Sequence, residues 1–444
     1  MSVRLAARGL AFAAAACLTL AAGRARADVT LLFWPGPESQ AMQKVIDAFN
    51  AGPGKTDGFA VKQLLFSRTG YFDKELADLA AGSKDFDLAL VTTYTLGRYV
   101  PFLSPVGDYV SAAAQQAYAP AALDSLKSDG ALYGVPTDIS VHFLYYRTDL
   151  IDRLLKDAAW QKEYAAIAKA RLGETMTPKP PADWHWDDYV ATSLFFTKSL
   201  NQASPVRYGT VLQLKNLIFN VMLWDDTLVA DGGNWLTAAG KPEIDSAPTM
   251  KAVRTYLTII QDHATPPGSI DYEFPEANQA FGSGQVATML QWNAAYAIVN
   301  DPKQMPMTAG HVGIAPMPAG PAGHKTHLHS LGIGLNKASS HKQQAGMFLT
   351  YLATEPAMEI YAKAGGTPPM PAVLQGMAAT HPDFALVAKE AAQDGYVIRG
   401  GTASTAMAIY TLLAEKLSAI WSGQVFPADG LKSVQQGMAS VLKP

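Results

Sequence analysis

Aromatic and hydrogen-bonding side chains stand together at several points where short apolar runs end. Trp34 follows "VTLLF", Tyr94 follows "FDLALVTT", and Trp292 follows "GQVATMLQ", with Asn293 beside it. Aromatic faces stack on the C–H faces of sugars, and polar side chains supply the donors and acceptors that a buried hydroxyl needs. The pattern therefore predicts a site for a small polyhydroxylated solute. The candidate ligand-binding residues are Trp34, Glu38, Arg68, Tyr94, Asp138, His142, Trp224, Trp292, Asn293, Gly366 and Arg399.

Several of these candidates also have a purely structural interpretation. Trp292 could be a core tryptophan, Asp138 a turn cap, and Arg399 a surface charge. Trp224 lies in "NVMLWDD", which is equally compatible with a buried helix face and with the lining of a cleft. For Trp292 and Asp138 we favour ligand contact.

A histidine-rich stretch, "HKTHLH", raises the question of a metal. His324, His327 and His329 have a spacing that could ligate zinc. No cysteine or carboxylate stands near them in the sequence, so we expect no metal there and no other cofactor. His329 or Ser330 could instead contact the ligand.

Tyr145 and Tyr146 are similar to the adjacent tyrosines of ferric-ion binders. Neighbouring residues of a strand point to opposite faces, so only one of the two could reach a common site. We therefore do not expect an iron site.

An enzymatic role would need a nucleophile with its base, or a paired acid and base. The chain has no G-x-S-x-G or H-E-x-x-H motif and no glycine-rich phosphate loop. Glu38 and Asp138 could in principle flank a glycosidic bond, which makes a carbohydrate-active enzyme the alternative class. We favour a binding protein without catalytic residues.

The segments that carry the candidates alternate between strand and helix patterns. The predicted strands are "VTLLFW", "FAVKQLLF" and "FDLALVTT", and the predicted helices between them are "SQAMQKVIDAFNAG" and "RTGYFDKELADLAAG". This alternation predicts a parallel sheet covered by helices, with ligands bound at the carboxyl ends of the strands. Further on, 286–290 is a predicted strand buried on both faces, with Trp292 just past its end. The extended run at 136–140 we interpret as a crossing between two lobes.

Length, charge and the N-terminal residues limit the class of protein further. The chain has 444 residues, a length that suggests two or three domains. Its net charge is -3, and it has no cluster of lysine and arginine that would indicate nucleic-acid binding. Residues 1–27 have the pattern of a signal peptide: Arg4 and Arg8, an apolar run at 10–22, and an A-x-A site before Asp28. Cys17, the one cysteine, lies inside the apolar run, which disfavours a lipid anchor.

An ordered set of short motifs resembles the extracellular solute-binding proteins of ABC importers, in the family that includes maltose-binding protein. After the signal and "VTLLFW" come "YGVP…LYYRTDL", "ADWHWDDYV", "FGSGQVATMLQW", "VGIAPMP", "LGIGLNKAS", "GGTPPMP" and "WSGQVFPADGLKSVQQGM". The resemblance covers nearly all of 28–444. Arg147 stands where that family usually has Asn, and the segment 154–181 is longer than the family leads us to expect.

The resemblance implies an α/β fold with two lobes, the type II periplasmic-binding-protein fold. Each lobe would be a mostly parallel sheet flanked by helices, with a hinge and a cleft between the lobes. The expected division is 28–138 with about 312–350 for the N-terminal lobe, and 139–311 with about 351–444 for the C-terminal lobe. The long segment 154–181 could reshape the rim of the C-terminal lobe.

The resemblance also implies a function. We expect a monomeric periplasmic protein that captures a carbohydrate or polyol, of mono- to oligosaccharide size, and delivers it to the membrane permease of an ABC transporter. A binding protein for a non-sugar solute, such as an anion, an amino acid derivative or a metal, is the alternative.

Overall fold

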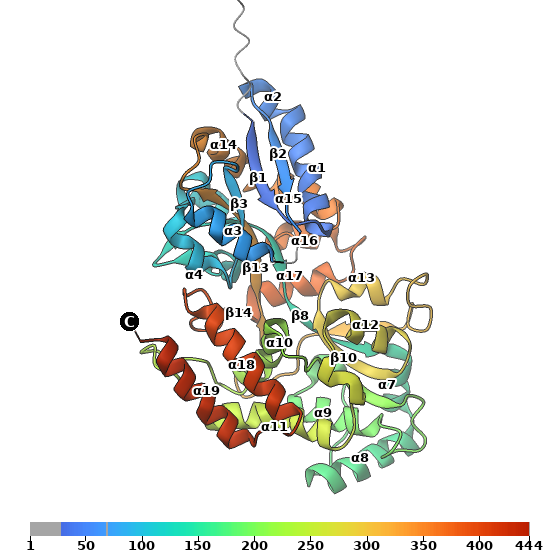
Figure 1. Ribbon diagram of the computed structural model, residues 1–444. Coiled ribbons are helices and arrows are strands. Elements are labelled where there is room, and N and C mark those ends of the chain that lie inside the picture. Colours follow the sequence, from blue (N-terminus) through green and yellow to red (C-terminus); the bar gives the residue numbers. More distant parts are fainter. Residues whose placement is uncertain (1–27, 68–69, 444) are drawn as a thin grey trace, which may run out of the picture.

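The computed structural model describes residues 28–67 and 70–443, which form two lobes, drawn one above the other in Figure 1. The upper lobe contains a six-stranded sheet and the lower lobe a four-stranded sheet, and helices pack around both. The predicted α/β architecture with two lobes is therefore confirmed. The signal-peptide prediction, Cys17 and the candidate Arg68 lie outside the described residues.

The upper, N-terminal lobe has the strand order β2-β1-β3-β13-β4, with β7 also paired to β13. β1 is parallel to β2 and β3, as predicted, while β13 runs antiparallel to β3, β4 and β7, so this sheet is mixed and not mostly parallel as expected. The strands are β1 (Val29–Phe33), β2 (Val61–Leu65), β3 (Leu88–Thr92), β4 (Leu103–Ser104), β7 (Val135–Ser140) and β13 (His329–Asn336). The carboxyl ends of β1 and β3 place Trp34 and Tyr94 at one edge of the sheet.

The first helix of this lobe, α1, shows how the spacing of apolar residues in the sequence predicts a helix. In α1 the apolar residues Met42, Val45, Ile46 and Phe49 recur at helical spacing and are all buried. The later helix α15 packs against α1, and α17 packs against α6, so the C-terminal half of the chain contributes to the N-terminal lobe. The main helices here are α1 (Pro37–Ala51), α3 (Tyr71–Ala80), α6 (Pro120–Asp124), α14 (Lys342–Leu352), α15 (Glu355–Lys363), α16 (Pro371–Met377) and α17 (Phe384–Gln393).

The lower, C-terminal lobe has the strand order β11-β8-β10-β9. β10 is antiparallel to β8 and parallel to β9, so the sheet is mixed rather than mostly parallel as expected. Its strands are β8 (His142–Arg147), β9 (Tyr208–Val211), β10 (Val286–Trp292) and β11 (Val312–Ala315). Its main helices are α7 (Thr148–Lys156), α8 (Ala158–Leu172), α9 (Trp186–Phe195), α10 (Ile218–Ala230), α11 (Ala247–Gln261), α12 (Phe274–Gly282), α18 (Ala406–Trp421) and α19 (Pro427–Val441).

The division between the lobes differs from the expected one in three places. β7 pairs with β13 as far as Ser140, so the first crossing comes at 141 instead of after 138. β11 pairs with β8, so 312–315 belongs to the C-terminal lobe and the chain returns to the N-terminal lobe only after it. The helices at 355–393 pack with α1 and α6, so the final crossing to the C-terminal lobe comes near 394–396 rather than near 351. The physical reason is that the local sequence of an apolar strand or helix does not show which of the two sheets it will pair with or pack against.

The stretch around Trp292 also differs in detail from its prediction. Phe281 lies near the end of α12, and Gly284, with φ 72°, makes the left-handed turn that joins this helix to β10. The predicted strand at 286–290 is buried at every position, as expected. The strand continues through Trp292 instead of ending before it, because Trp292 pairs with His142 at the start of β8.

None of the helices in the described part of the chain is both long and apolar enough to cross a bilayer.

Candidate functional site

The lobes are joined by three crossings that lie against one another. The first is Val141, between β7 and β8; the second is β12 (Thr326–His327) with Leu328, leading into β13; the third is β14 (Gly395–Tyr396). β12 and β14 pair in parallel, with His327 opposite Tyr396. Thr326 ties the second crossing to the first, because its hydroxyl accepts from the His142 N–H at 2.8 Å and donates to the His142 carbonyl at 3.1 Å. The predicted crossing at 136–140 thus ends one residue before the lobe boundary.

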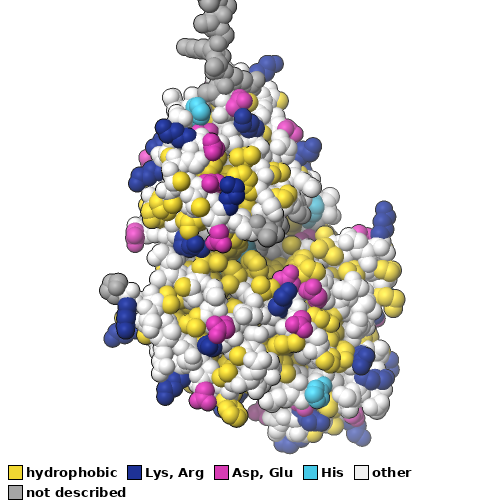
Figure 2. Space-filling view, viewed as in Figure 1, with side chains coloured by type: hydrophobic (Ala, Val, Ile, Leu, Met, Phe, Trp, Pro, Cys, Tyr) yellow, Lys and Arg dark blue, Asp and Glu magenta, His cyan; other side chains and the backbone are white. Residues whose placement is uncertain are grey.

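A continuous chain of aromatic rings runs through this junction from one lobe to the other. Each ring lies within 4.0–5.9 Å of the next, measured between centroids, and the order is Trp34, Phe72, Tyr94, His329, Trp292, His142, His327 and Tyr396. Trp34, Phe72, Tyr94 and His329 belong to the N-terminal lobe. Trp292 and His142 belong to the C-terminal lobe, and His327 and Tyr396 lie on the second and third crossings. In Figure 2 hydrophobic side chains gather where the two lobes meet, across the middle of the face. Ring stacking against a ligand at this junction would engage both lobes at once.

Two carboxyl groups of the N-terminal lobe, those of Asp138 and Glu38, lie close to one another. Asp138, on β7, is buried, and its Oδ2 accepts from the backbone N–H of Thr367 at 2.8 Å. Burial, followed by the negative charge of Glu38, raises the pKa of Asp138 well above its usual range, so the two carboxyls are close enough to interact. The fully buried phenol of Tyr361 lies beside both. Glu38 itself is half-buried in the first turn of α1.

A third carboxyl, Asp226 on α10, organises the C-terminal side. Its Oδ2 lies 2.6 Å from His142 Nδ1, and its Oδ1 accepts from the His327 N–H at 2.5 Å and from the Tyr396 hydroxyl at 2.9 Å. One side chain therefore holds residues of all three crossings. Burial raises the pKa of Asp226, and the neighbouring His142 opposes that rise.

The remaining candidates lie outside the chain of rings. Trp224 is buried in the core face of α10. Asn293 clamps the first crossing: its N–H donates to the Val141 carbonyl at 2.9 Å, and its Oδ1 accepts from the Val141 N–H at 3.1 Å. Arg399 is exposed and contacts the Leu236 carbonyl and, at 3.9 Å, Glu243.

Gly366 packs against Tyr361, whose phenol lies beside Asp138 and Glu38. A Cβ on Gly366 would lie 2.0 Å from Cε1 of Tyr361, which leaves room for glycine alone at this position. The ring of Tyr361 is thereby held against the loop that supplies the Thr367 N–H.

The metal candidates do not assemble into a ligand set. Across 28–67 and 70–443, no group of three or more His, Cys, Asp or Glu side chains is placed to hold an ion. His324 turns away to the Met317 carbonyl, 2.7 Å from its Nδ1. Tyr145 is buried, with its hydroxyl donating to the Trp292 carbonyl at 2.8 Å, whereas Tyr146 packs against Gly313, which matches the expectation that the two tyrosines face opposite ways.

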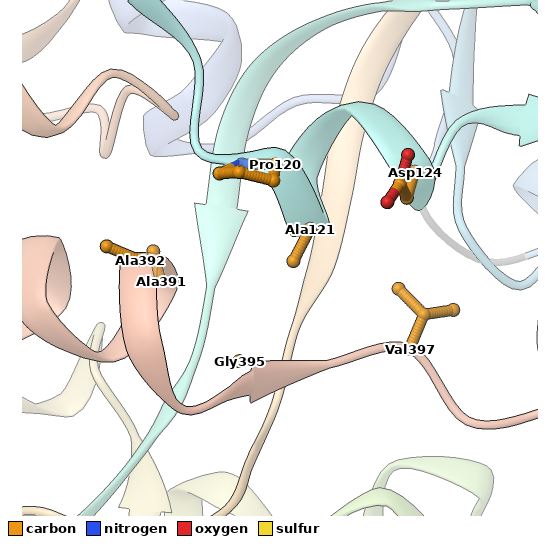
Figure 3. A pocket seen from close by; sticks show the side chains of 7 residues that line it. All are labelled: Pro120, Ala121, Asp124, Ala391, Ala392, Gly395 and Val397. Atoms are coloured by element: carbon orange, nitrogen blue, oxygen red, sulfur yellow. The ribbon is translucent and has the colours of Figure 1, made fainter.

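A separate cavity of about 390 Å³ lies beside the third crossing. It opens between α6, the end of α17 and the segment after it, as Figure 3 shows. The one charged side chain in its lining is Asp124, whose carboxylate is paired with Lys127 at 2.9 Å. The residues that line it are Pro120, Ala121, Asp124, Ala391, Ala392, Gly395 and Val397, so it contains none of the candidate ligand-binding residues.

Several residues of the junction were not singled out from the sequence. Phe72, Asp226 and Tyr396 each join the network, and His327 was considered only as a zinc ligand. The signal for Asp226 was present, because Asp225 and Asp226 interrupt an otherwise apolar helix, and a charge inside such a helix needs a partner.

Comparison with known proteins places the chain in a family. The model of the family described as bacterial extracellular solute-binding protein matches residues 35–359. A mannitol-binding protein of Pseudomonas aeruginosa is 23% identical over 320 residues, covering 70% of this chain and 66% of its own length. A probable amino-acid ABC transporter periplasmic-binding protein of Sinorhizobium fredii is 23% identical over 367 residues, covering 81% and 76%.

Among solved structures, maltose-bound MalE3 of T. maritima has a TM-score of 0.74 and 22% identity, covering 94% of this chain and 100% of that one. At this identity the likeness concerns the fold, and it agrees with the two lobes described above. The family match spans well over half of the sequence and confirms the resemblance drawn from its motifs. The chain belongs to the bacterial extracellular solute-binding protein family, and it is a solute-binding protein of the ABC-transporter type rather than an enzyme.

Proposed function

We propose that the solute is a neutral carbohydrate or polyol, of mono- to trisaccharide size, held where the two lobes meet. The observation that carries this proposal is the chain of rings across the junction, with Asp226 bound to His142 within it and the carboxyl pair of Asp138 and Glu38 in the N-terminal lobe. Rings provide stacking faces, and carboxyl and imidazole groups bind hydroxyls. The ligand contacts we propose are made by Trp34, Glu38, Tyr94, Asp138, His142, Trp292 and the loop at Gly366.

The charge of the site favours a neutral solute over an anion. Among the described residues, no lysine or arginine forms an ion pair with Glu38, Asp138 or Asp226. An anionic ligand would add a further negative charge beside buried carboxyls, where repulsion is strong. The mannitol and maltose in the names of two similar proteins support the same class.

Binding at a junction built from both lobes couples the solute to closure. A solute that contacts Tyr94 from one lobe and Trp292 from the other is bound best when the lobes are together, so it shifts the hinge equilibrium toward the closed state. We propose that this closed form docks on the permease of an ABC transporter and that the protein acts as a monomer.

A thermal-shift screen tests the solute class. The panel should contain maltose, mannitol, ribitol, amino acids, phosphate and sulfate. A ligand at 100 times its Kd adds about 2.7 kcal/mol to the free energy of unfolding, which is a clear rise in melting temperature. We expect shifts with sugars or polyols; shifts confined to amino acids would favour the class named for the Sinorhizobium fredii relative, and shifts confined to phosphate or sulfate would favour an anion.

We also propose export to the periplasm with removal of residues 1–27. The supporting pattern is the apolar run followed by the A-x-A site. The intact mass of the secreted protein should correspond to a chain that begins at Asp28. A mass beginning at Met1, or one increased by a lipid on Cys17, would contradict it.

A further inference from the structure

Three imidazoles surround the indole of Trp292, and their ring nitrogens are incompletely paired. The centroid distances from Trp292 are 4.0 Å to His142, 4.9 Å to His329 and 6.2 Å to His327. Nε2 of His142, both ring nitrogens of His327 and Nδ1 of His329 are buried and have no hydrogen-bond partner among the described residues. Buried polar groups nearly always have hydrogen-bond partners, so four unpaired ring nitrogens beside one indole indicate partners supplied from outside the chain.

Asp226 determines which nitrogen of His142 carries the proton. A carboxylate can only accept hydrogen bonds, and Asp226 Oδ2 lies 2.6 Å from His142 Nδ1. The proton of a neutral His142 is therefore on Nδ1, and its Nε2 keeps a free lone pair. The Oδ1 atom is occupied by the His327 N–H and the Tyr396 hydroxyl, which fixes the orientation of the carboxylate.

We propose that His142 Nε2 accepts a hydrogen bond from a ligand hydroxyl at the face of Trp292, and that Asp226 is the positioning residue that keeps this nitrogen an acceptor. This inference rests on the proposed function and names the polar contact within it. The ligand group at this point is an uncharged hydroxyl donor, as in a sugar or polyol. The open nitrogens of His327 and His329 can bind neighbouring hydroxyls of the same molecule.

The surroundings agree with an uncharged subsite. Burial, followed by the proximity of His142, lowers the pKa of His329 to about 3. Burial, with the neighbouring histidines, also lowers the pKa of His327 well below its usual range. Near neutral pH both rings are therefore uncharged, and they offer no positive charge to a phosphate or carboxylate.

The Asp226→Asn variant isolates the positioning role. The amide retains an oxygen for the His327 N–H and the Tyr396 hydroxyl but presents an NH₂ group to His142 Nδ1. The proton of His142 then moves to Nε2, which becomes a donor. The matched control is Asp231→Asn, because Asp231 directly follows the same helix, is also buried and has its own partner in Lys251 at 2.6 Å.

Two measurements on the full mature chain decide the matter. Calorimetric titration with maltose, mannitol and ribitol gives Kd for each protein, and ¹⁵N NMR of the imidazoles, assigned with His142→Gln, gives the tautomer of His142 without any ligand. We expect the Nδ1–H tautomer in the wild type, the Nε2–H tautomer in Asp226→Asn, and at least a tenfold weaker Kd in that variant for whichever of the three probes the wild type binds. Asp231→Asn should lose stability but keep both Kd and tautomer.

The outcomes separate this inference from the proposed function. If the wild type binds a probe and the Kd of Asp226→Asn for that probe is within twofold of the wild-type value, the inference is overturned and the proposed function stands. An Nε2–H tautomer in the wild type would lead to the same conclusion. If the wild type bound none of the three probes but bound phosphate, both would fail, since the imidazoles would then be serving an anion.

Discussion

The imidazole of His142 lies edge-on to the indole of Trp292, with ring centroids 4.0 Å apart and planes at 70°. This pair begins β8 and ends β10, and the two residues are direct partners in the antiparallel register. The indole is therefore oriented by a strand pairing rather than by a flexible loop. If the solute binds where we propose, one stacking face is preorganised before the ligand arrives, which would reduce the entropy lost on binding.

Replacing Trp292 by alanine should weaken solute binding at least tenfold. Stacking on a sugar that removes about 60 Å² of additional apolar area from water is worth roughly 1.5 kcal/mol at ~25 cal/mol per Å², which is near tenfold in affinity. The measurement is Kd by calorimetry for the sugar or polyol that stabilises the wild type.

Trp160→Ala is the matched control, because Trp160 is 5% exposed and Trp292 8% exposed, both in the C-terminal lobe. Trp160 packs on Phe195 and Phe196, so its loss should cost about 3–5 kcal/mol of stability and leave Kd unchanged. Equal effects of the two variants on Kd would show that Trp292 is a core residue.

Asn293 should contribute more to the stability of the hinge than to solute binding. Its Oδ1 accepts the Val141 N–H at 3.1 Å, in the middle of the first crossing. Asn293→Ala leaves that buried N–H without an acceptor and should lower the free energy of unfolding by about 1–3 kcal/mol. Asn293→Asp, measured at a pH low enough to protonate the new carboxyl, keeps an acceptor oxygen without burying a charge and should recover most of the loss in urea denaturation. If alanine and aspartate destabilise equally, the clamp on Val141 is not what Asn293 contributes.

How much of this could be predicted from the sequence depends on the range of the interaction. The periodicity of α1 and the strand patterns at β1, β2 and β3 predict their elements, because burial there recurs with the local repeat. The placement of β11 and of the helices at 355–393 was wrong, because which sheet an apolar element covers depends on distant partners. The same limit applies to the site.

Trp34, Tyr94, His142 and Trp292 were identified because they follow or begin strands, and the structure brings all four into one chain of rings. Asp226 was missed because its partners are 84, 101 and 170 residues away along the chain. No local spacing records such contacts.

Gly366 should not tolerate a side chain. Its Cβ would lie 2.0 Å from the ring of Tyr361, so Gly366→Ala must displace that phenol from its place beside Asp138. We expect a lower melting temperature and weaker solute binding, both measured in one thermal-shift titration. Gly376→Ala is the matched control, since nothing lies within 4 Å of its Cβ position and it sits in α16, where alanine is the better helix former. A Gly366→Ala protein with wild-type melting and Kd would contradict this account.

Glu390 should make the protein less stable as pH rises. This residue of α17 is fully buried, and neither of its carboxyl oxygens has a hydrogen-bond partner among the described residues. Burial, with the negative charge of Asp394 next in effect, raises the pKa of Glu390 from 4.5 to about 8. Between these two values the folded protein holds a proton that the unfolded chain has released, so the contribution of Glu390 to stability is full below pH 4.5 and is lost as pH rises toward 8.

Urea denaturation of wild type and Glu390→Gln across pH 4.5–8 measures that loss. Each unit by which the folded pKa exceeds the unfolded one is worth about 1.4 kcal/mol, so the wild type should lose a few kcal/mol relative to the glutamine variant over this range. The amide cannot ionise, and its profile should lack this decline. Glu359→Gln, at an exposed position paired with Lys363, should follow the wild-type profile. Parallel profiles for wild type and Glu390→Gln would mean that the carboxyl of Glu390 ionises in the folded protein as readily as in the unfolded chain.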